Sequence, residues 1–176
     1  MNQGATMQEI VFTGDSLIEY YDWAARFPEY RVHNMGWSGE TVEGLLGRIE
    51  LIIRQCPNPD FIFIMSGTNN IALEKTDFTA AYRHIIDKLK KVFPTTRICI
   101  HSLPPILIPW FDSELVPQAN GKLRTLADKT GIDLIDVYKL FQKNGVNQCL
   151  VEDGVHISDQ GYATWSAAVA KMIGTK

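Results

Sequence analysis

Short apolar runs recur along the chain, separated by longer segments in which apolar residues follow helical spacing. The runs rich in Ile, Val and Phe predict five strands, at residues 9–13, 30–34, 60–65, 97–101 and 132–137. The run at 30–34 is the weakest of them. Because the runs lack a clean alternation of apolar and polar residues, we expect strands that are covered on both faces, as in a parallel sheet.

The segments between these runs predict four helices, at residues 41–55, 76–93, 118–129 and from 158 or 159 to 172. Thr41 is a candidate N-cap for the first helix, Pro94 ends the second, and Gly131 ends the third. Strands that alternate with helices of this length form βαβ units with right-handed crossovers. The sequence therefore predicts an α/β fold with a helix layer on each face of five parallel strands.

One domain spanning residues 1–176 accounts for the whole chain, with residues 1–7 expected to form a flexible N-terminus. Three polar loops that contain glycine follow the first three predicted strands, at residues 14–16, 36–39 and 67–70. Ligands of open parallel sheets bind beyond the carboxyl ends of the strands. We therefore expect these loops to lie together and to form the functional site.

Charge and composition narrow the classes of function. The net charge is −3, so the chain lacks the basic surface that binds a nucleic-acid backbone. Three cysteines without CxxC spacing predict neither a disulfide framework nor a zinc site. The chain has no apolar stretch of about 20 residues, which predicts no membrane span. It also has no signal-peptide pattern, so we expect a cytoplasmic protein; a secreted mature form and homo-oligomerisation stay open.

Three polar residues have the chemistry of nucleophilic catalysis. Ser16 follows the first strand, and Asp153 and His156 precede the last helix. A serine hydroxyl needs a base, and a neutral imidazole can accept its proton at neutral pH. Asp153 is close enough in sequence to orient the imidazole ring. The alternative is structural: Ser16 caps a helix, Asp153 forms a turn before Gly154, and His156 is a surface residue.

Hydrolysis of an ester also requires hydrogen-bond donors for the oxyanion of the tetrahedral intermediate. The candidates are the backbone N–H groups of Ser16 and Gly39 and the side-chain amide of Asn69. Gly39, lacking a Cβ atom, lets a substrate approach closely. Turn formation alone would also explain Gly39 and Asn69, so neither residue decides the function by itself.

Four motifs occur in order along the chain: Gly14-Asp15-Ser16-Leu17, the segment 34–41, Gly67-Thr68-Asn69-Asn70, and Asp153-Gly154-Val155-His156 followed by Gly161-Tyr162. Together they resemble the SGNH, or GDSL, hydrolase family over residues 10–172. The resemblance implies a flavodoxin-like fold and hydrolysis of esters or thioesters without a metal or organic cofactor. It implies Ser16 as nucleophile, His156 as base and Asp153 as its orienter, with Ser16, Gly39 and Asn69 around the oxyanion. Many family members have Asp where this chain has Asn70, which leaves the positioning of Asn69 open.

The substrate side is less well defined by the sequence. An apolar loop at 103–111 follows the fourth strand and could line an acyl pocket, or else pack on a helix or another subunit. Trp110 in this loop and Trp37 beside the oxyanion glycine are the candidate substrate contacts. A chain of this length leaves little room for a lid, so we expect short acyl groups such as acetyl. His33 and His101, at strand ends, are expected to be hydrogen-bonded packing residues.

These observations favour a serine esterase that acts on a small-molecule ester through an acyl-enzyme. Two alternatives stay open at this point: a non-catalytic, flavodoxin-like module that binds a small ligand, and an acyltransferase that uses the same site. Asp153 and His156 discriminate against the first, because a loop cluster that only cradles a phosphate needs neither residue.

Overall fold

The computed structural model describes residues 7–175 and contains one sheet of five parallel strands. The strands are β1 (Glu9–Gly14), β2 (Arg31–Gly36), β3 (Phe61–Met65), β4 (Arg97–His101) and β5 (Asp133–Ile135), in the spatial order β2-β1-β3-β4-β5. This order is that of flavodoxin-like folds. The predicted fold class is confirmed, whereas the expected flexible N-terminus at residues 1–7 lies, except for Met7, outside the described residues.

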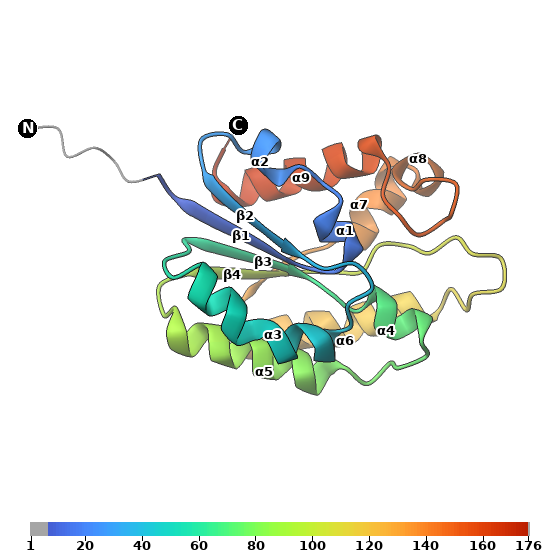
Figure 1. Cartoon of the computed structure of the whole chain (residues 1–176). Helices are drawn as coiled ribbons and strands as arrows, with labels where there is room; N and C mark the ends of the chain where they lie inside the picture. The colour runs from blue at the N-terminus through green and yellow to red at the C-terminus, as the bar shows by residue number, and fades with distance from the viewer. Residues whose placement is uncertain (1–6, 176) are drawn as a thin grey trace, which may run out of the picture.

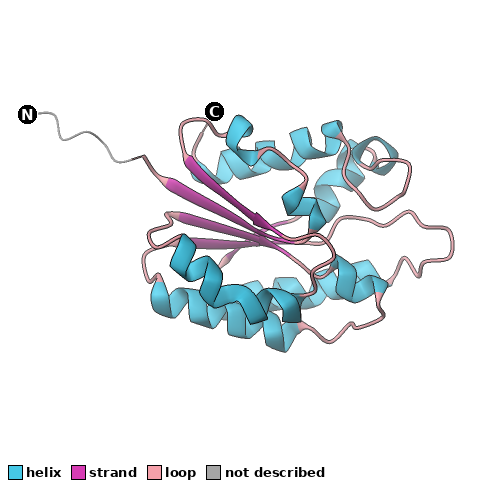
Figure 2. Ribbon diagram, viewed as in Figure 1, coloured by secondary structure: helices cyan, strands magenta, loops and turns pink. Residues whose placement is uncertain are grey.

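Helices cover both faces of the sheet (Figures 1 and 2). One layer contains α3 (Val42–Gln55), α4 (Thr68–Ala72), α5 (Thr79–Val92) and α6 (Leu115–Thr130). The other contains α1 (Ser16–Glu19), α2 (Trp23–Arg26), α7 (Val137–Asn144), α8 (Val146–Cys149) and α9 (Asp159–Ile173). No helix within residues 7–175 combines the length and apolar character needed to cross a membrane.

Alternate residues of the central strands pack into two separate apolar clusters. Val11 and Ile62 belong to the cluster beneath α3, α5 and α6. Ile10, Phe12 and Phe63 belong to the cluster beneath α1, α2 and α9. Burial of apolar side chains on both faces explains why these strands read as continuous apolar runs.

The four long helices end close to their predicted boundaries, and two of their starts differ for local reasons. Thr41 caps α3 as expected, its hydroxyl accepting the Gly44 N–H at 3.3 Å. The helix predicted from residue 76 begins at Thr79, after a turn that contains Glu74 with a φ of 56°. The helix predicted from residue 118 begins at Leu115, since Pro117 lies in its first turn, where proline needs no N–H partner.

The fifth strand is shorter than predicted because a helix begins inside the apolar run. The Asp136 carboxylate accepts the Lys139 N–H at 3.2 Å and caps α7, which removes Val137 from the strand. The short helices α1, α2, α4 and α8 were not predicted individually. Helices of one turn are too short to show helical periodicity.

The interpretation of the two strand-end histidines is half correct. His33 Nε2 lies 3.2 Å from Glu9 Oε2, as expected for a hydrogen-bonded packing residue. His101 is fully buried between the rings of Phe63 and Trp165, and neither of its ring nitrogens has a partner within residues 7–175. The prediction of a hydrogen bond for His101 is therefore wrong. Burial lowers the pKa of His101 from 6.5 to about 3.

Candidate active site

Ser16 lies at the carboxyl end of β1, where the sheet order changes direction between β1 and β3. Gly14 makes the turn possible: its φ is +150°, and a Cβ atom there would lie 1.7 Å from the Met65 carbonyl oxygen. Asp15 caps α1 by accepting the Leu17 N–H at 3.0 Å. The structural alternative for Ser16 is therefore wrong, because Asp15 is the cap and the Ser16 hydroxyl faces another group.

That group is the imidazole of His156, which arrives from the other end of the chain. Ser16 Oγ lies 3.3 Å from His156 Nε2, and His156 Nδ1 lies 2.6 Å from Asp153 Oδ2. Asp153 also forms the turn considered as its alternative role, since its Oδ1 accepts the N–H groups of Val155 and His156 at 2.8 and 2.9 Å. One carboxylate thus holds both the turn and the ring.

These contacts determine the proton positions in the resting site. Burial alone raises the pKa of Asp153, but hydrogen bonds from the His156 ring and from two backbone N–H groups outweigh it, so the pKa lies below 3.8. An ionised carboxylate only accepts hydrogen bonds, so Nδ1 of a neutral His156 carries the proton. Nε2 then has a free lone pair directed at the Ser16 hydroxyl, the arrangement a general base requires.

The three predicted oxyanion donors are also brought together. Trp37 N–H donates to the Gly14 carbonyl at 2.8 Å, which places the loop after β2 beside the turn that contains Ser16. The Asn69 amide donates to the Glu40 carbonyl at 3.0 Å, next to Gly39. Gly39 has a φ of +76°, and its N–H and that of Ser16 donate to no acceptor within the described part of the chain. Both N–H groups are therefore available to a ligand.

A family model matches most of the chain. The model of the GDSL-like lipase/acylhydrolase family matches residues 12–164, which include Ser16, Gly39, Asn69, Asp153 and His156. The chain belongs to this family.

Two curated proteins are similar to part of the chain. The α1 subunits of platelet-activating factor acetylhydrolase IB from rat and mouse are each 27% identical over 101 residues. The match includes 55% of this chain and 44% of each relative, so the chain spans less than half the length of these proteins.

Solved structures of GDSL-like esterases share the fold. Axe2, an acetylxylan esterase from Geobacillus stearothermophilus, is 23% identical with a TM-score of 0.81, over 100% of this chain and 98% of that one. A GDSL-like lipase from Bacteroides thetaiotaomicron is 21% identical with a TM-score of 0.77, over 95% and 88%. Catalytic mutants of Axe2 replace a serine or a histidine by alanine.

The local contacts of Asn70 explain why this chain has asparagine where many family members have aspartate. Asn70 is fully buried; its Oδ1 accepts the Val42 N–H at 2.9 Å, and its Nδ2 donates to Glu43 Oε2 at 2.8 Å. Burial raises the pKa of Glu43, but the hydrogen bond from Asn70 and others outweigh it, so the pKa lies below 4.5. An Asp at this position would face a second carboxylate without a proton to donate. Asn70 thereby fastens the start of α4, which carries Asn69, to the start of α3.

Several residues around the site were not identified from the sequence. The Tyr20 ring stacks on His156 with centroids 5.5 Å apart, and its hydroxyl lies 3.0 Å from Ser38 Oγ. Glu19 accepts the Ser38 N–H at 2.8 Å. These contacts of Ser38 hold the end of α1 against the loop from Trp37 to Glu40, here called the oxyanion loop after the predicted role of Gly39. Among residues 7–175, no group of three or more His, Cys, Asp or Glu side chains could hold a metal ion.

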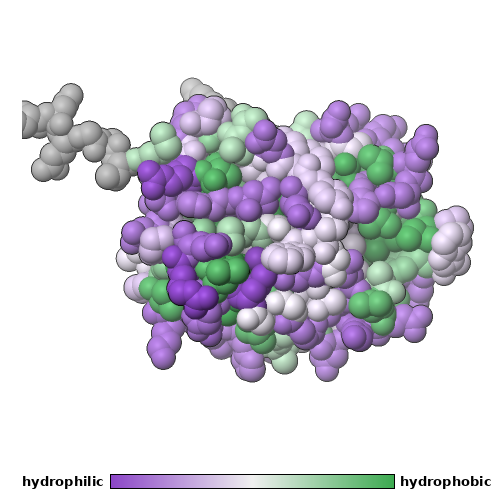
Figure 3. All heavy atoms as spheres, in the orientation of Figure 1, coloured by the Kyte–Doolittle hydropathy of each residue, from purple (hydrophilic) through white to green (hydrophobic). Residues whose placement is uncertain are grey.

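The loop after β4 divides into a buried part and an exposed part. Its first residues, from Leu103 to Ile106, are buried, whereas the Trp110 side chain near its tip is 87% exposed. Leu107 N–H donates to the Gly154 carbonyl at 2.8 Å, which places the loop beside the turn that contains Asp153. Figure 3 shows apolar surface where this loop leaves the body of the molecule. Trp37 is 61% exposed at the rim of the site, so the predicted contacts of Trp37 and Trp110 with a substrate stay predictions.

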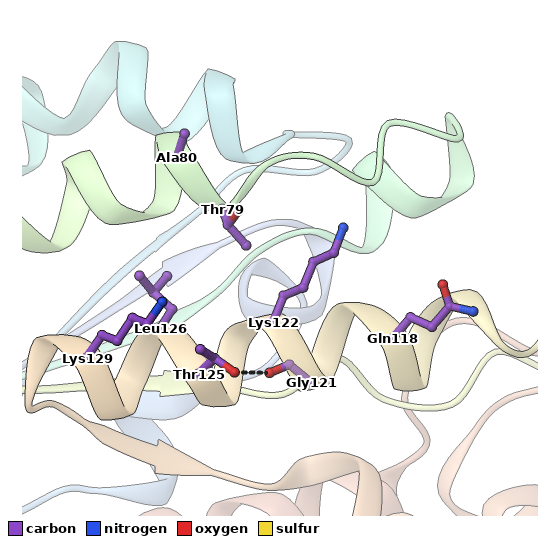
Figure 4. Close-up of a pocket in the computed structure, with 8 residues that line it drawn as sticks. All are labelled: Thr79, Ala80, Gln118, Gly121, Lys122, Thr125, Leu126 and Lys129. Carbon is purple, nitrogen blue, oxygen red and sulfur yellow. Dashed lines mark hydrogen bonds between the residues drawn. The ribbon is translucent and has the colours of Figure 1, made fainter.

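One groove lies away from the predicted active-site residues. It has a volume of about 680 Å³ and runs between α5 and α6, with Thr79, Gln118, Lys122 and Lys129 among its lining residues (Figure 4). A cavity of about 560 Å³ is lined by Thr41 and Glu43. Another, of about 330 Å³, is lined by Leu107, Glu152 and Gly154, beside the Asp153 turn. Ser16 lines none of the three.

Two buried groups are expected to give opposite pH dependences of stability. Burial raises the pKa of Asp15 from 3.8 to about 7, against the hydrogen bond from the Leu17 N–H. As the pH falls from 7, folded Asp15 takes up a proton before the unfolded chain does, which stabilises the fold. His101, with its folded pKa near 3, stays neutral while the unfolded chain takes up a proton below pH 6.5, which destabilises the fold.

We therefore expect the two contributions to cancel nearly in the wild-type protein between pH 7 and pH 5. Each changes the free energy of unfolding by about 2 kcal/mol over this range. His101→Phe should be more stable at pH 5 than at pH 7 by about that amount, and Asp15→Asn less stable by a similar amount. Urea unfolding of the three proteins at both pH values measures this. Identical pH dependence in all three would show that neither group titrates as described.

Proposed function

We propose that this chain is a serine esterase in which Ser16 is the nucleophile, His156 the general base and Asp153 the residue that orients the imidazole. The observation that carries the proposal is the continuous contact from Ser16 Oγ through the His156 ring to Asp153 Oδ2, with distances of 3.3 and 2.6 Å. A serine without such a base is a weak nucleophile at neutral pH.

In the proposed reaction, Ser16 Oγ attacks the ester carbonyl carbon while its proton moves to His156 Nε2. The resulting imidazolium lies beside the ionised Asp153 carboxylate, which stabilises its charge. His156 then protonates the departing alcohol oxygen, and the acyl group stays on Ser16. A water molecule attacks this acyl-enzyme, again giving its proton to His156. The imidazolium then protonates Ser16 Oγ as the bond between Oγ and the acyl carbon breaks, and the carboxylic acid leaves.

The developing oxyanion needs donors that are already oriented, because reorienting them during the reaction would raise the barrier. We assign this role to the N–H groups of Ser16 and Gly39 and to the Asn69 amide. The two backbone groups have no protein acceptor within the described residues, and Asn69 uses only one of its two N–H bonds on the Glu40 carbonyl. The remaining Asn69 N–H is the third donor.

We propose acetyl or another short acyl group as the acid part of the ester. Two kinds of relative support this: Axe2 is an acetylxylan esterase and the rat and mouse proteins are subunits of an acetylhydrolase. Ser16 lines none of the cavities of about 680, 560 and 330 Å³, so none of them holds a long chain directly at the Ser16 hydroxyl.

Comparison of two p-nitrophenyl esters tests both the activity and the acyl preference. We expect p-nitrophenyl acetate to be hydrolysed with a higher kcat/KM than p-nitrophenyl palmitate, because a long chain would gain no buried contacts here. The release of p-nitrophenol gives both rates. Because the palmitate ester must be dispersed in detergent, both esters are assayed at the same detergent concentration. A preference for palmitate would overturn the proposed acyl class, and hydrolysis of neither ester would count against the activity itself.

A further inference from the structure

Arg48 is a charged residue on a helix face that is otherwise apolar. It lies on α3 in line with Leu45, Ile49 and Ile52, all of which are buried. Its side chain is only 14% exposed, and that of Glu40, with which it pairs, is 7% exposed. Charged groups are rarely buried without a specific partner, so a close pair in this position requires an explanation.

The guanidinium of Arg48 connects the carboxyl ends of two strands to the oxyanion loop. Its Nε and Nη2 donate to the two Glu40 carboxylate oxygens at 2.5 and 2.7 Å. Nη2 also donates to the backbone carbonyls of Met35, at 2.7 Å, and Gly14, at 3.4 Å. The Trp37 ring centroid lies 5.9 Å from the guanidinium carbon. Arg48 thus contacts residues at both ends of the loop from Trp37 to Glu40.

The backbone of Glu40 belongs to the predicted oxyanion site. Its carbonyl accepts the Asn69 side-chain amide at 3.0 Å, and its neighbour in the chain is Gly39. Any movement of Glu40 would therefore displace the Gly39 N–H and release Asn69 together. Among the described residues, the Glu40 N–H donates to no acceptor outside the loop, since its partner is the Trp37 carbonyl at 3.1 Å.

We propose that Arg48 is a positioning residue for ester hydrolysis, acting through Glu40 to hold the Gly39 and Asn69 donors in place. This inference rests on the proposed function, since it concerns the oxyanion of that reaction. A planar guanidinium can bind both oxygens of one carboxylate while donating to a strand carbonyl. A lysine ammonium cannot reproduce this geometry, so the positive charge alone is insufficient.

The test compares Arg48→Met and Arg48→Lys with Arg83→Met. Arg83 is an exposed arginine on α5 that pairs with Asp87 at 2.7 Å, and it provides a matched loss of one guanidinium. We measure kcat and KM with p-nitrophenyl acetate and the affinity for a trifluoromethyl ketone, whose adduct with a serine carries an oxyanion. Circular dichroism at the assay temperature establishes that each variant is folded. If Arg48→Met does not fold, the comparison is made with Arg48→Lys alone.

Both Arg48 variants are expected to lower kcat by about 10²-fold or more, the effect of losing one oxyanion donor, with little change in KM. The affinity for the trifluoromethyl ketone should fall in parallel with kcat/KM, whereas Arg83→Met should match the wild type. A residue with only a structural role would lower the melting temperature without this parallel loss.

A double variant makes the test more specific. If Arg48 acts through the donors, adding Arg48→Lys to Asn69→Ala should lower kcat by a smaller factor than Arg48→Lys does alone, because one of the two donors that Arg48 positions is already absent. Full additivity, or wild-type kcat in folded Arg48→Lys, would overturn the inference. Absence of Ser16-dependent hydrolysis in the wild-type protein would instead overturn the proposed function, which separates the two failures.

Discussion

Replacement of Ser16 with alanine is expected to lower kcat for p-nitrophenyl acetate by about 10⁴-fold to 10⁶-fold. The hydroxyl is the only group within hydrogen-bond reach of His156 Nε2 in the described residues, at 3.3 Å, so the imidazole would have no proton to accept. The oxyanion donors would still bind the ester, which leaves some catalysis by water. Steady-state release of p-nitrophenol measures the loss.

The fold should survive this substitution because the Asp15 carboxylate, and not the Ser16 hydroxyl, caps α1. A melting temperature close to that of the wild type would establish that point. Ser113→Ala removes an exposed hydroxyl from the loop after β4 and provides the matched control. Comparable turnover by the two alanine variants would exclude Ser16 as the nucleophile.

Replacement of Asp153 with asparagine is expected to cost nearly as much, about 10⁴-fold in kcat, through the tautomer of His156. Oδ1 of Asp153 accepts two backbone N–H groups at 2.8 and 2.9 Å, so the asparagine oxygen must take that place. Its NH₂ group then faces His156 Nδ1, which must become an acceptor. The ring proton moves to Nε2, where it points at Ser16 and leaves no lone pair for the serine proton.

Glu152→Gln is the matched control for this variant, since it removes a negative charge from the adjacent, exposed position without touching the ring. We expect Glu152→Gln to retain wild-type kcat, and Asp153→Asn to retain the wild-type far-ultraviolet circular dichroism. Equal kcat for these two variants would mean that the carboxylate does not select the tautomer, and the role proposed for Asp153 would fail.

Much of the fold was predictable because burial on both faces leaves a strong pattern in the sequence. The strand at 97–101 matches β4 in full, and Thr41 and Gly131 cap the helices predicted for them. The end of β5 was not predictable from its apolar run, because the Asp136 cap converts Val137 from strand to helix. In that case a local hydrogen bond outweighed the hydrophobic pattern.

The candidate site was predictable where its motifs lie next to glycines and turns. Ser16 and His156 were named separately, and the crossovers of the fold bring them together over 140 residues of chain. The Arg48–Glu40 pair was not identified, although a charged residue in line with Leu45 and Ile49 was a visible signal. The stacking of Tyr20 on His156 carries no signal, because it depends on how α1 faces the turn before α9.

The family match and the structure argue against one of the two alternative functions, the small-ligand-binding module, and leave the acyltransferase to be tested. Membership of the GDSL-like lipase/acylhydrolase family, together with the contact between Ser16 and His156, disfavours a module that only binds a small ligand. A binding module would need Asp153 only for its turn, which Oδ1 forms. Oδ2 instead contacts the imidazole of His156, as expected in a catalytic site. Product analysis with added alcohols distinguishes transfer of the acyl group to water, as in an esterase, from transfer to an alcohol, as in an acyltransferase.

The central claim is that the imidazole of His156 removes the proton of one particular serine. Reaction with a fluorophosphonate probe, followed by peptide mapping, tests it most directly, because such probes react much faster with a serine hydroxyl that a base activates than with other serines. We predict a single adduct, on Ser16, that is absent in Ser16→Ala and forms far more slowly in Asp153→Asn. An adduct on another serine, or ester hydrolysis by a protein that the probe leaves unmodified, would contradict the account.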